Sequence, residues 1–276
     1  MNPVEPALFD SAADLERRFG GLRRLYGDAT YARIRAAHVV VVGVGGVGSW
    51  TAEALARSGV AALTLVDLDH VSESNINRQV QALGSTLGEA KVDALKRRIA
   101  DIHPGCEVVA VEEFVEPANW PALLAGGRAI DVVVDACDEG RAKAVLAGWA
   151  LGSGTPLVVV GAAGGKREPQ AVAVEDLGLL THDPMLASLR QRLRKHHGAA
   201  RSGRIGLRCV YSREPLQAPA DACDVDGSLN CHGYGSSVAV TATFGMVAAS
   251  VAIESLQAVV GGAQTRPDII EGLPGC

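Results

Sequence analysis

A glycine-rich loop is the first feature of this sequence that could do chemistry. A run of four valines is followed by Gly43, Gly45, Gly46 and Gly48. Because glycine carries no side chain, such a loop can turn tightly and bring its backbone N–H groups against phosphate oxygens. Asp67 stands 19 residues beyond Gly48, where a carboxylate can accept hydrogen bonds from a ribose hydroxyl. Together these features predict a nucleotide site, and both NAD and ATP satisfy them.

The segment beyond Asp67 distinguishes between the two nucleotides. It carries a second carboxylate, two amides and two cations, at Asp69, Asn75, Gln79, Arg78 and Lys91. An oxidoreductase that uses NAD has no need of cations at this place. An enzyme that forms an adenylate does, because negative charge builds on the triphosphate while a carboxylate attacks the α-phosphorus. The segment therefore favours ATP.

Two aspartates lie at the end of a strand expected at 131–135 and just beyond it. Asp135 ends this strand and Asp138 comes three residues later. The carboxyl ends of parallel strands meet at one edge of a sheet, so both aspartates should lie near the glycine loop. Mg²⁺ prefers oxygen ligands, and we expect Asp138 to hold the Mg²⁺ that accompanies ATP. We expect catalytic roles for Arg78, Lys91 and Asp138.

Strands and helices must position these residues. Aliphatic runs predict five strands, at 38–42, 62–66, 107–111, 131–135 and 156–160, and the first of them is expected to be buried. Helices are expected at 14–37, 49–58, 88–102, 141–152 and 236–256. Strands that alternate with helices indicate an α/β fold, here a Rossmann-like, doubly wound and mainly parallel sheet. Residues 170–174 are expected to extend this sheet with an antiparallel strand.

The chain divides into three parts by pattern. We expect an N-terminal helical arm at 1–37, a Rossmann-like ATP-binding domain at 38–175, and a C-terminal part at 176–276 packed on that domain. The C-terminal part holds a long insertion and the strongly apolar segment 236–256. This segment approaches the length of a membrane span, but Thr241 and Thr243 interrupt it, so a buried helix is favoured over membrane association.

The composition is that of a globular protein. The chain has 276 residues, of which 48% are hydrophobic and 21% charged. No basic start leads into an apolar signal core, so we expect a cytoplasmic location. None of the six cysteines forms a CxxC pair, which argues against a structural zinc site. Cys231, beside His232, is left open as a functional thiol.

Charge is distributed unevenly along the chain. The net charge is −5, yet the stretch from Met185 to Arg213 has eight basic residues and no acidic one. Six of these are candidates for contact with a polyanion: Arg190, Arg192, Arg194, Lys195, Arg201 and Arg204. A basic stripe on an acidic protein is typical of a nucleic-acid contact, and a solvated helix face is the plainer alternative.

The combined motifs resemble the ubiquitin-activating-enzyme-like superfamily, whose bacterial members include ThiF and MoeB. The likeness rests on Gly43-x-Gly45-Gly46-x-Gly48, Asp67-x-Asp69, Asn75-x-x-Arg78-Gln79, Lys91 and Asp135-x-x-Asp138. The resemblance implies that Asp67 binds the ribose of ATP and that Asn75, Arg78 and Lys91 bind its phosphates. It also implies that Asp138 lies beside Mg²⁺ and the α-phosphate.

Within the superfamily the sequence is most similar to the tRNA threonylcarbamoyladenosine dehydratases. The likeness extends from about Arg18 to Leu256 and includes Arg18-Phe-Gly-Gly, Arg24-Leu-Tyr-Gly27, Gly161-x-Ala-Gly-Gly165 and Thr241-Ala-Thr-Phe-Gly245. The resemblance implies ATP-dependent loss of water from N6-threonylcarbamoyladenosine next to the tRNA anticodon. The threonyl carboxylate would form an acyl-adenylate before a ring closes.

The same resemblance implies partners. Family members are homodimers, and an N-terminal arginine of one subunit enters the other subunit's ATP site; Arg18 and Arg24 are the candidates. Relatives are associated with cysteine desulfurase systems, and the superfamily's paired zinc cysteines are missing here. The alternatives are an adenylyltransferase that activates a ubiquitin-like sulfur-carrier protein, an NAD-dependent oxidoreductase and a non-catalytic tRNA-binding protein.

Overall fold

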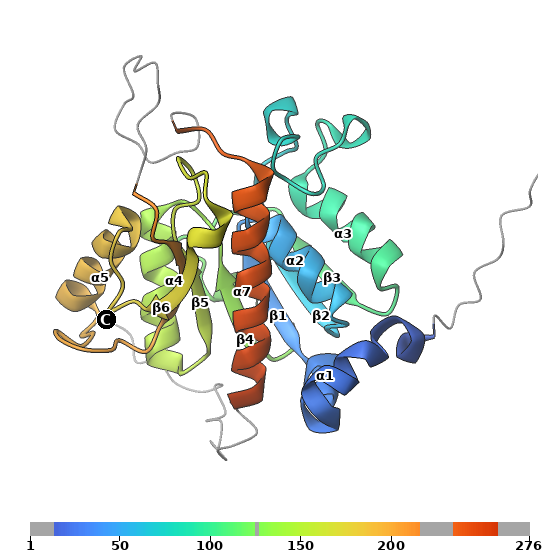
Figure 1. Cartoon of the computed structure of the whole chain (residues 1–276), viewed down its shortest axis with the longest axis horizontal. Coiled ribbons are helices and arrows are strands. Elements are labelled where there is room, and N and C mark those ends of the chain that lie inside the picture. Colours follow the sequence, from blue (N-terminus) through green and yellow to red (C-terminus); the bar gives the residue numbers. More distant parts are fainter. Residues whose placement is uncertain (1–13, 125–126, 216–233, 259–276) are drawn as a thin grey trace, which may run out of the picture.

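The computed structural model describes residues 14–124, 127–215 and 234–258, which build one sheet with helices on both faces (Figure 1). Its strands are β1 (His38–Val42), β2 (Ala62–Val66), β3 (Glu107–Val111), β4 (Val132–Asp135), β5 (Leu157–Val160), β6 (Val172–Asp176) and β7 (Arg208–Ser212). Its helices are α1 (Leu15–Ala36), α2 (Gly48–Arg57), α3 (Lys91–Ile102), α4 (Gly140–Ser153), α5 (Pro184–His196) and α7 (Val238–Ala258). Short 3₁₀ helices lie in the connections: η1 (Glu73–Asn75), η2 (Gly84–Thr86), η3 (Ala122–Leu124) and η4 (Pro169–Ala171).

The seven strands are arranged in the order β3-β2-β1-β4-β5-β7-β6. Every neighbouring pair is parallel except β6 and β7, which are antiparallel. β1 and β4 are neighbours although β2 and β3 come between them in the chain, so the winding reverses at this point. Open α/β sheets bind their ligands at such a switch point. The predicted Rossmann-like, doubly wound sheet is confirmed, including its antiparallel extension.

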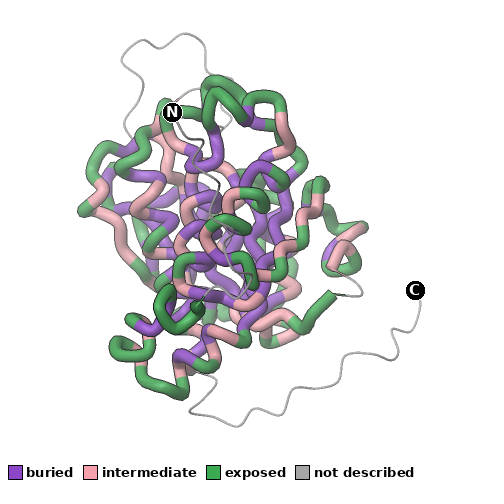
Figure 2. The backbone as a smooth tube through the Cα atoms, turned by 90° about the vertical axis from the view of Figure 1, so that its right-hand side faces the viewer, coloured by how far each residue is buried: buried purple, intermediate pink, exposed green. Residues whose placement is uncertain are grey.

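Alternate residues of the strands build two apolar layers, because successive side chains of a strand point to opposite faces. Val39 and Val41 of β1 face the layer of α2, α3 and α7. Val40 and Val42 face the layer of α4 and α5 on the other side. β1 and β2 are buried at every position, and Figure 2 shows that the buried backbone gathers in the centre of the molecule. Strands buried on both faces are aliphatic throughout, which is why the sequence pattern identifies them.

β7 is a strand that the sequence pattern does not predict. It lies within the expected insertion and is placed between β5 and β6 in the sheet. Its residues, Arg-Cys-Val-Tyr-Ser, lack the aliphatic run of the other inner strands, yet four of the five are buried. Helix α5 comes from the same segment and is capped at its start by Asp183.

The N-terminal helix α1 is tied to the body of the protein. Asp14 caps its start by accepting a hydrogen bond from the N–H of Arg17 at 3.0 Å. The helix is kinked at Gly27, whose φ of 80° is not helical. Arg18 Nη1 donates to the carbonyl oxygen of Ile102 at 2.6 Å, so the arm holds the C-terminal end of α3.

Helix α7 is long and apolar enough to cross a membrane, and half of its most apolar stretch is buried inside the protein. It packs along α2 and against β4, β5 and β7. Gly245 permits this close approach, because a Cβ atom there would lie 2.6 Å from the Cβ of Trp50. Thr51 Oγ1 also donates to the carbonyl oxygen of Gly245 at 3.2 Å. These contacts support the buried helix favoured from the sequence, with each end two residues later than predicted.

Candidate active site

A cavity of about 880 Å³ opens at the carboxyl ends of β1, β2, β4 and β5. Ten of the twelve residues predicted to bind the nucleotide line it: Gly43, Gly45, Gly46, Asp67, Asp69, Asn75, Arg78, Gln79, Lys91 and Asp138. The other two, Gly48 and Asp135, are buried and do not line it. The cavity lies at the switch point of the sheet, where parallel strand ends bring these separate segments together.

The glycine loop joins β1 to α2. Gly43 has a φ of +80°, and a Cβ atom there would lie 2.8 Å from the backbone of Cys137. A Cβ atom at Gly48 would overlap the carbonyl oxygen of Gly43. The N-cap residue of α2, Val47, makes no side-chain hydrogen bond, so the positive end of the helix dipole is available to an anion. The loop has the form of a phosphate cradle.

Asp67 holds the glycine loop and faces the cavity. Its Oδ2 accepts a hydrogen bond from the N–H of Val44 at 2.8 Å, and its Oδ1 accepts one from the N–H of Asp69 at 2.9 Å. Burial raises the pKa of this carboxyl, and the charge of nearby Lys91 opposes the rise. A carboxylate has about four acceptor positions, so Asp67 can also bind the hydroxyls of a ribose.

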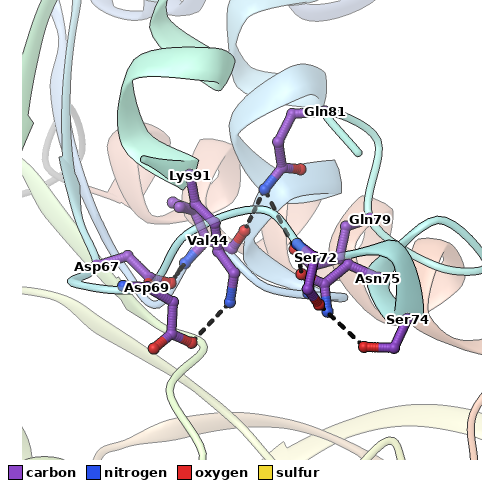
Figure 3. A network of polar contacts seen from close by, with 9 residues as sticks. All are labelled: Val44, Asp67, Asp69, Ser72, Ser74, Asn75, Gln79, Gln81 and Lys91. Carbon is purple, nitrogen blue, oxygen red and sulfur yellow. Dashed lines mark hydrogen bonds and ion pairs between the residues drawn. The ribbon is translucent and has the colours of Figure 1, made fainter. Parts of the chain in front are cut away.

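The connection from β2 to α3 carries the polar network drawn in Figure 3. Lys91 Nζ contacts Asp69 Oδ2 at 2.7 Å, and only 8% of the Lys91 side chain is exposed. Asn75 Oδ1 accepts a hydrogen bond from the N–H of Ser72 at 3.0 Å, which caps η1. The lysine and the amide therefore reach the cavity from a braced loop.

Arg78 is held through its backbone and its side chain. Trp50 Nε1 and Thr241 Oγ1 donate to its carbonyl oxygen, at 2.9 and 3.4 Å. Its own Nη1 donates to the carbonyl oxygen of Ser74 at 2.7 Å. Trp50 belongs to α2 and Thr241 to α7, so two helices fix this cation at the cavity wall.

Three residues of the site carry no motif that sequence reasoning could have used. Gln81 is 1% exposed, and its Nε2 donates to the carbonyl oxygen of Val44 at 2.9 Å, which braces the glycine loop (Figure 3). Phe114, which follows β3, lines the cavity and is 54% exposed. Arg141 lines it from the first turn of α4. Only tertiary contact distinguishes these side chains from others of the same type.

Asp138 lines the cavity beyond β4, whereas Asp135 lies beneath it. Asp135 is fully buried, and its Oδ1 accepts hydrogen bonds from Lys143 Nζ at 3.1 Å and from Cys137 Sγ at 2.9 Å. Lys143 is also fully buried and donates to the carbonyl oxygen of Val160 at 2.7 Å. Burial lowers the pKa of Lys143, but the charge of Asp135 and the other neighbouring groups together outweigh burial, so the pKa is raised. The structure thus places Asp135, predicted to bind nucleotide, in a buried ion pair.

Comparison with known proteins identifies the family. The ThiF family profile matches residues 18–271. The chain belongs to the ThiF family. The tRNA threonylcarbamoyladenosine dehydratase of Escherichia coli (strain K12) is 41% identical over 254 residues, which are 88% of this chain and 94% of that protein. The Haemophilus influenzae protein of the same name is 38% identical over 246 residues, 87% and 94% of the two chains.

A solved structure is also similar to this ThiF family member. The crystal structure of the E. coli dehydratase TcdA in complex with ATP matches with a TM-score of 0.81 and 40% sequence identity. The match covers 90% of this chain and 98% of the other. The similarity therefore extends over nearly the whole chain.

The basic residues of this ThiF family member differ in exposure and in the contacts that they make. Arg190 is half-buried, and its Nη1 donates to the carbonyl oxygens of Leu177 and Leu180. Arg194 Nε donates to the carbonyl oxygen of Ala200 at 3.0 Å. The exposed members of the predicted set are Arg192, Lys195, Arg201 and Arg204. Arg190 therefore supports the fold before α5, and the exposed residues are better placed for an external polyanion.

The remaining candidates fall in different places. Arg18 is bonded to α3 of its own chain, whereas Arg24 is exposed on α1. Cys231 lies outside the described residues. Within residues 14–124, 127–215 and 234–258, no group of three or more His, Cys, Asp or Glu side chains is placed to hold a metal ion.

Proposed function

We propose that this protein is an ATP-dependent tRNA threonylcarbamoyladenosine dehydratase. The observation that carries the proposal is the convergence of a glycine cradle, a ribose-binding carboxylate and two cations in one cavity, in a chain similar over its length to two dehydratases of that name. The substrate is tRNA that carries N6-threonylcarbamoyladenosine next to the anticodon. The reaction removes one water from that nucleoside.

The cavity fits ATP residue by residue. The loop at Gly45 and Gly46 offers backbone N–H groups with no side chain between them and a phosphate. Arg78 and Lys91 supply positive charge where a triphosphate gains negative charge during adenylation. Asp67 accepts hydrogen bonds from the ribose, because both its oxygens are already oriented by the loop.

Asp138 is the residue that would hold Mg²⁺ with the nucleotide. Proteins bind Mg²⁺ mostly through one or two carboxylates together with substrate phosphates, rather than in a cage of protein ligands. The exposed carboxylate of Asp138 at the cavity wall fits this mode. When bound, the ion supplies positive charge to the phosphates.

The chemistry proceeds in two displacements. An oxygen of the threonyl carboxylate attacks the α-phosphorus, the bond from that phosphorus to the bridging oxygen breaks, and pyrophosphate leaves. A nitrogen or oxygen of the same modified nucleoside then attacks the acyl carbon, gives up its proton, and expels AMP with the carboxylate oxygen. Ring closure within one molecule needs no nucleophile from the enzyme. Burial raises the pKa of the Cys137 thiol well above its usual value, so this cavity residue stays protonated.

We further propose how the macromolecular partners meet the site. The exposed basic residues Lys195, Arg201 and Arg204 bind tRNA phosphates. A second copy of the chain contributes Arg24 to the ATP site. Arg24 is preferred to Arg18 because Arg18 already holds the end of α3. The reaction takes place in the cytoplasm, because the substrate tRNA is found there.

A mass measurement tests the proposed reaction. The protein is incubated with ATP, Mg²⁺ and tRNA that carries the modified adenosine, and the nucleosides are then weighed. We expect a loss of one water from the modified nucleoside, with release of AMP and pyrophosphate. If the nucleoside is unchanged and AMP passes to a ubiquitin-like carrier protein, the adenylyltransferase alternative replaces the proposal.

Removing the Asp138 carboxylate tests its role within that reaction. Asp138→Ala should lower turnover at least about 100-fold, because the protein would no longer hold the Mg²⁺ that stabilises negative charge on the phosphates. Asp138 is exposed, so the variant should unfold at the same temperature as the wild type. Asp101→Ala, at an exposed aspartate of α3 away from the cavity, serves as the control. Full turnover by the Asp138 variant would contradict the assignment.

A further inference from the structure

A second, smaller cavity adjoins the nucleotide cavity. It measures about 250 Å³, and its wall includes Asp138, Pro184, Met185, Ser188, Leu189 and Arg192. We call it the side pocket. Asp138 and Met185 line both cavities, so the two spaces meet beside the carboxylate assigned to the reacting phosphate. ATP occupies the larger cavity in the proposed function, and the side pocket is left without an occupant.

The wall between the two cavities is rigid. Asp183 Oδ1 accepts a hydrogen bond from the N–H of Leu186 at 2.9 Å, which caps α5. Its Oδ2 accepts one from the N–H of Ala162 at 2.9 Å, and Ala162 lines the nucleotide cavity. A Cβ atom at Gly161 would overlap Asp183, so the two segments lie in contact. Helix α5 also packs against α4 (Figure 1), which supports the side pocket from a second side.

Arg192 is the exposed cation of the side pocket; Lys143 also lines it, but is fully buried and paired with Asp135. Its Nη1 donates to the carbonyl oxygen of Gly140 at 3.0 Å, two residues beyond Asp138 in the chain. This bond fixes one nitrogen of the guanidinium at the start of α4 and leaves the exposed side chain with further donors for a ligand. Arg190 and Arg194, two residues away on either side, do not line the pocket. Arg192 is therefore the member of the basic stretch that reaches the chemistry.

The rest of the side pocket is small and half apolar. Met185 and Leu189 are buried and offer contact to a methyl group, while Ser188 is exposed and offers a hydroxyl. A threonyl group carries one methyl, one hydroxyl and one carboxylate. Each of these has a matching group on the wall. Leu189 and Met185 can contact the methyl group, Ser188 the hydroxyl group and Arg192 the carboxylate.

We infer that the side pocket binds the threonyl group of the modified adenosine, with Arg192 paired to its carboxylate; this rests on the proposed function. The carboxylate must approach an α-phosphate that is itself negative, next to the negative Asp138. A cation at the meeting point of the two cavities lowers that repulsion. The planar fork of arginine holds a carboxylate through two parallel hydrogen bonds, which also aims the attacking oxygen.

Binding of two anticodon stem-loop RNAs tests the role of Arg192. The RNAs have one sequence, and only one carries the threonylcarbamoyl group. The wild type should prefer the modified RNA. Arg192→Gln should abolish the preference by weakening the modified RNA alone, by about 10- to 100-fold, the size of a lost charged hydrogen bond. Arg194→Gln removes the same charge from α5 outside the pocket, so it should affect the two RNAs equally.

Several results of this experiment would overturn the inference. Arg192→Gln that keeps the wild-type preference would exclude contact with the threonylcarbamoyl group. Equal weakening of both RNAs, with a salt dependence reduced by about one ion, would assign Arg192 to a backbone phosphate instead. ATP binding equal to wild type shows that the variant is folded. Failure of the wild type to remove water from the modified RNA would refute the proposed function, and it is read out separately.

A pocket-filling variant tests whether the threonyl group occupies the side pocket. Ser188→Phe adds bulk at an exposed position of the pocket wall and should not disturb the core. Its kcat/KM should fall at least about 10-fold on RNA with the threonylcarbamoyl group and much less on RNA with the smaller glycylcarbamoyl group. Gln191→Ala, at an exposed neighbour outside the pocket, is the control. An equal fall on both RNAs would show that the threonyl group does not occupy the pocket.

Discussion

At the scale of single residues, the buried pair of Lys143 and Asp135 supports the nucleotide cavity, although neither residue lines it. Neither side chain has any exposed surface. Removing two charges from water is costly, so a buried pair seldom adds net stability. This pair joins α4 to the end of β4, and Lys143 also binds the carbonyl oxygen of Val160 at the end of β5. We interpret it as the support of the loop that carries Asp138.

Removing only one partner of this pair should lower the free energy of unfolding more than removing both charges. Lys143→Met leaves Asp135 as a buried charge without its cation, so the free energy of unfolding should fall by about 3–5 kcal/mol. Urea denaturation measures the loss. Adding Asp135→Asn removes the stranded charge and keeps an acceptor for Cys137, so the double variant should recover part of the loss. A double variant less stable than Lys143→Met would refute this account.

His103 makes the stability of the fold depend on pH. Its Nε2 lies 2.9 Å from Arg35 Nη1, and burial, helped by Arg35 and Arg18, lowers its pKa from 6.5 to about 4. Between these values the unfolded chain binds the proton and the folded chain does not. The free energy of unfolding should therefore fall as the pH drops from 6.5 towards 4.

The contribution of His103 can be isolated by comparison with a variant. His103→Gln keeps an acceptor for Arg35 but does not titrate. Urea denaturation at pH 7 and pH 5 should show a smaller loss of stability for the variant than for the wild type. An identical loss in both proteins would show that His103 has its ordinary pKa in the folded chain.

At the scale of elements, the contact of α2 with α7 connects the core to the site. Gly245 leaves room for Trp50 of α2, and Trp50 and Thr241 together hold the carbonyl oxygen of Arg78. The contact between α2 and α7 therefore buries the apolar helix α7 and also positions Arg78, a cation of the cavity. Packing and function depend on one contact here.

Adding a methyl group at this contact should lower both the stability of the fold and the affinity for ATP. Gly245→Ala brings a Cβ atom within 2.6 Å of Trp50, which forces the helices apart. We expect about 1–3 kcal/mol of lost stability, measured by urea denaturation, and a raised KM for ATP. Gly152→Ala in α4, where a Cβ atom meets open space, should instead be neutral or slightly stabilising. Equal stability of the two variants would contradict the close contact.

At the scale of the whole molecule, the proposed dimer makes each ATP site depend on two chains. Arg24→Ala and Asp138→Ala should each be inactive, because each removes one part of the site. After subunit exchange, a mixed dimer has one site with both parts intact, so mixing the two inactive proteins should restore activity. Turnover of the mixture checks this. No recovery, with exchange verified by mass, would show that Arg24 does not act in the partner's site.

The sequence by itself determined the inner strands β1, β2, β4 and β5 and ten residues of the cavity. Strands buried on both faces must be aliphatic, and the carboxyl ends of parallel strands must meet at one edge, so local pattern was enough. The glycine loop alone was compatible with NAD as well as ATP; the residues that follow β2 and β4 made the difference.

Only the tertiary structure decided the rest. β7 has no aliphatic run and is a strand because β5 and β6 offer it hydrogen-bonding edges. Asp135 is an ion-pair partner because Lys143 meets it inside the fold. Arg190 and Arg192 are alike in sequence, yet Arg192 lines the side pocket and Arg190 does not. Each outcome depends on contacts between residues far apart in the chain, and no local pattern records such contacts.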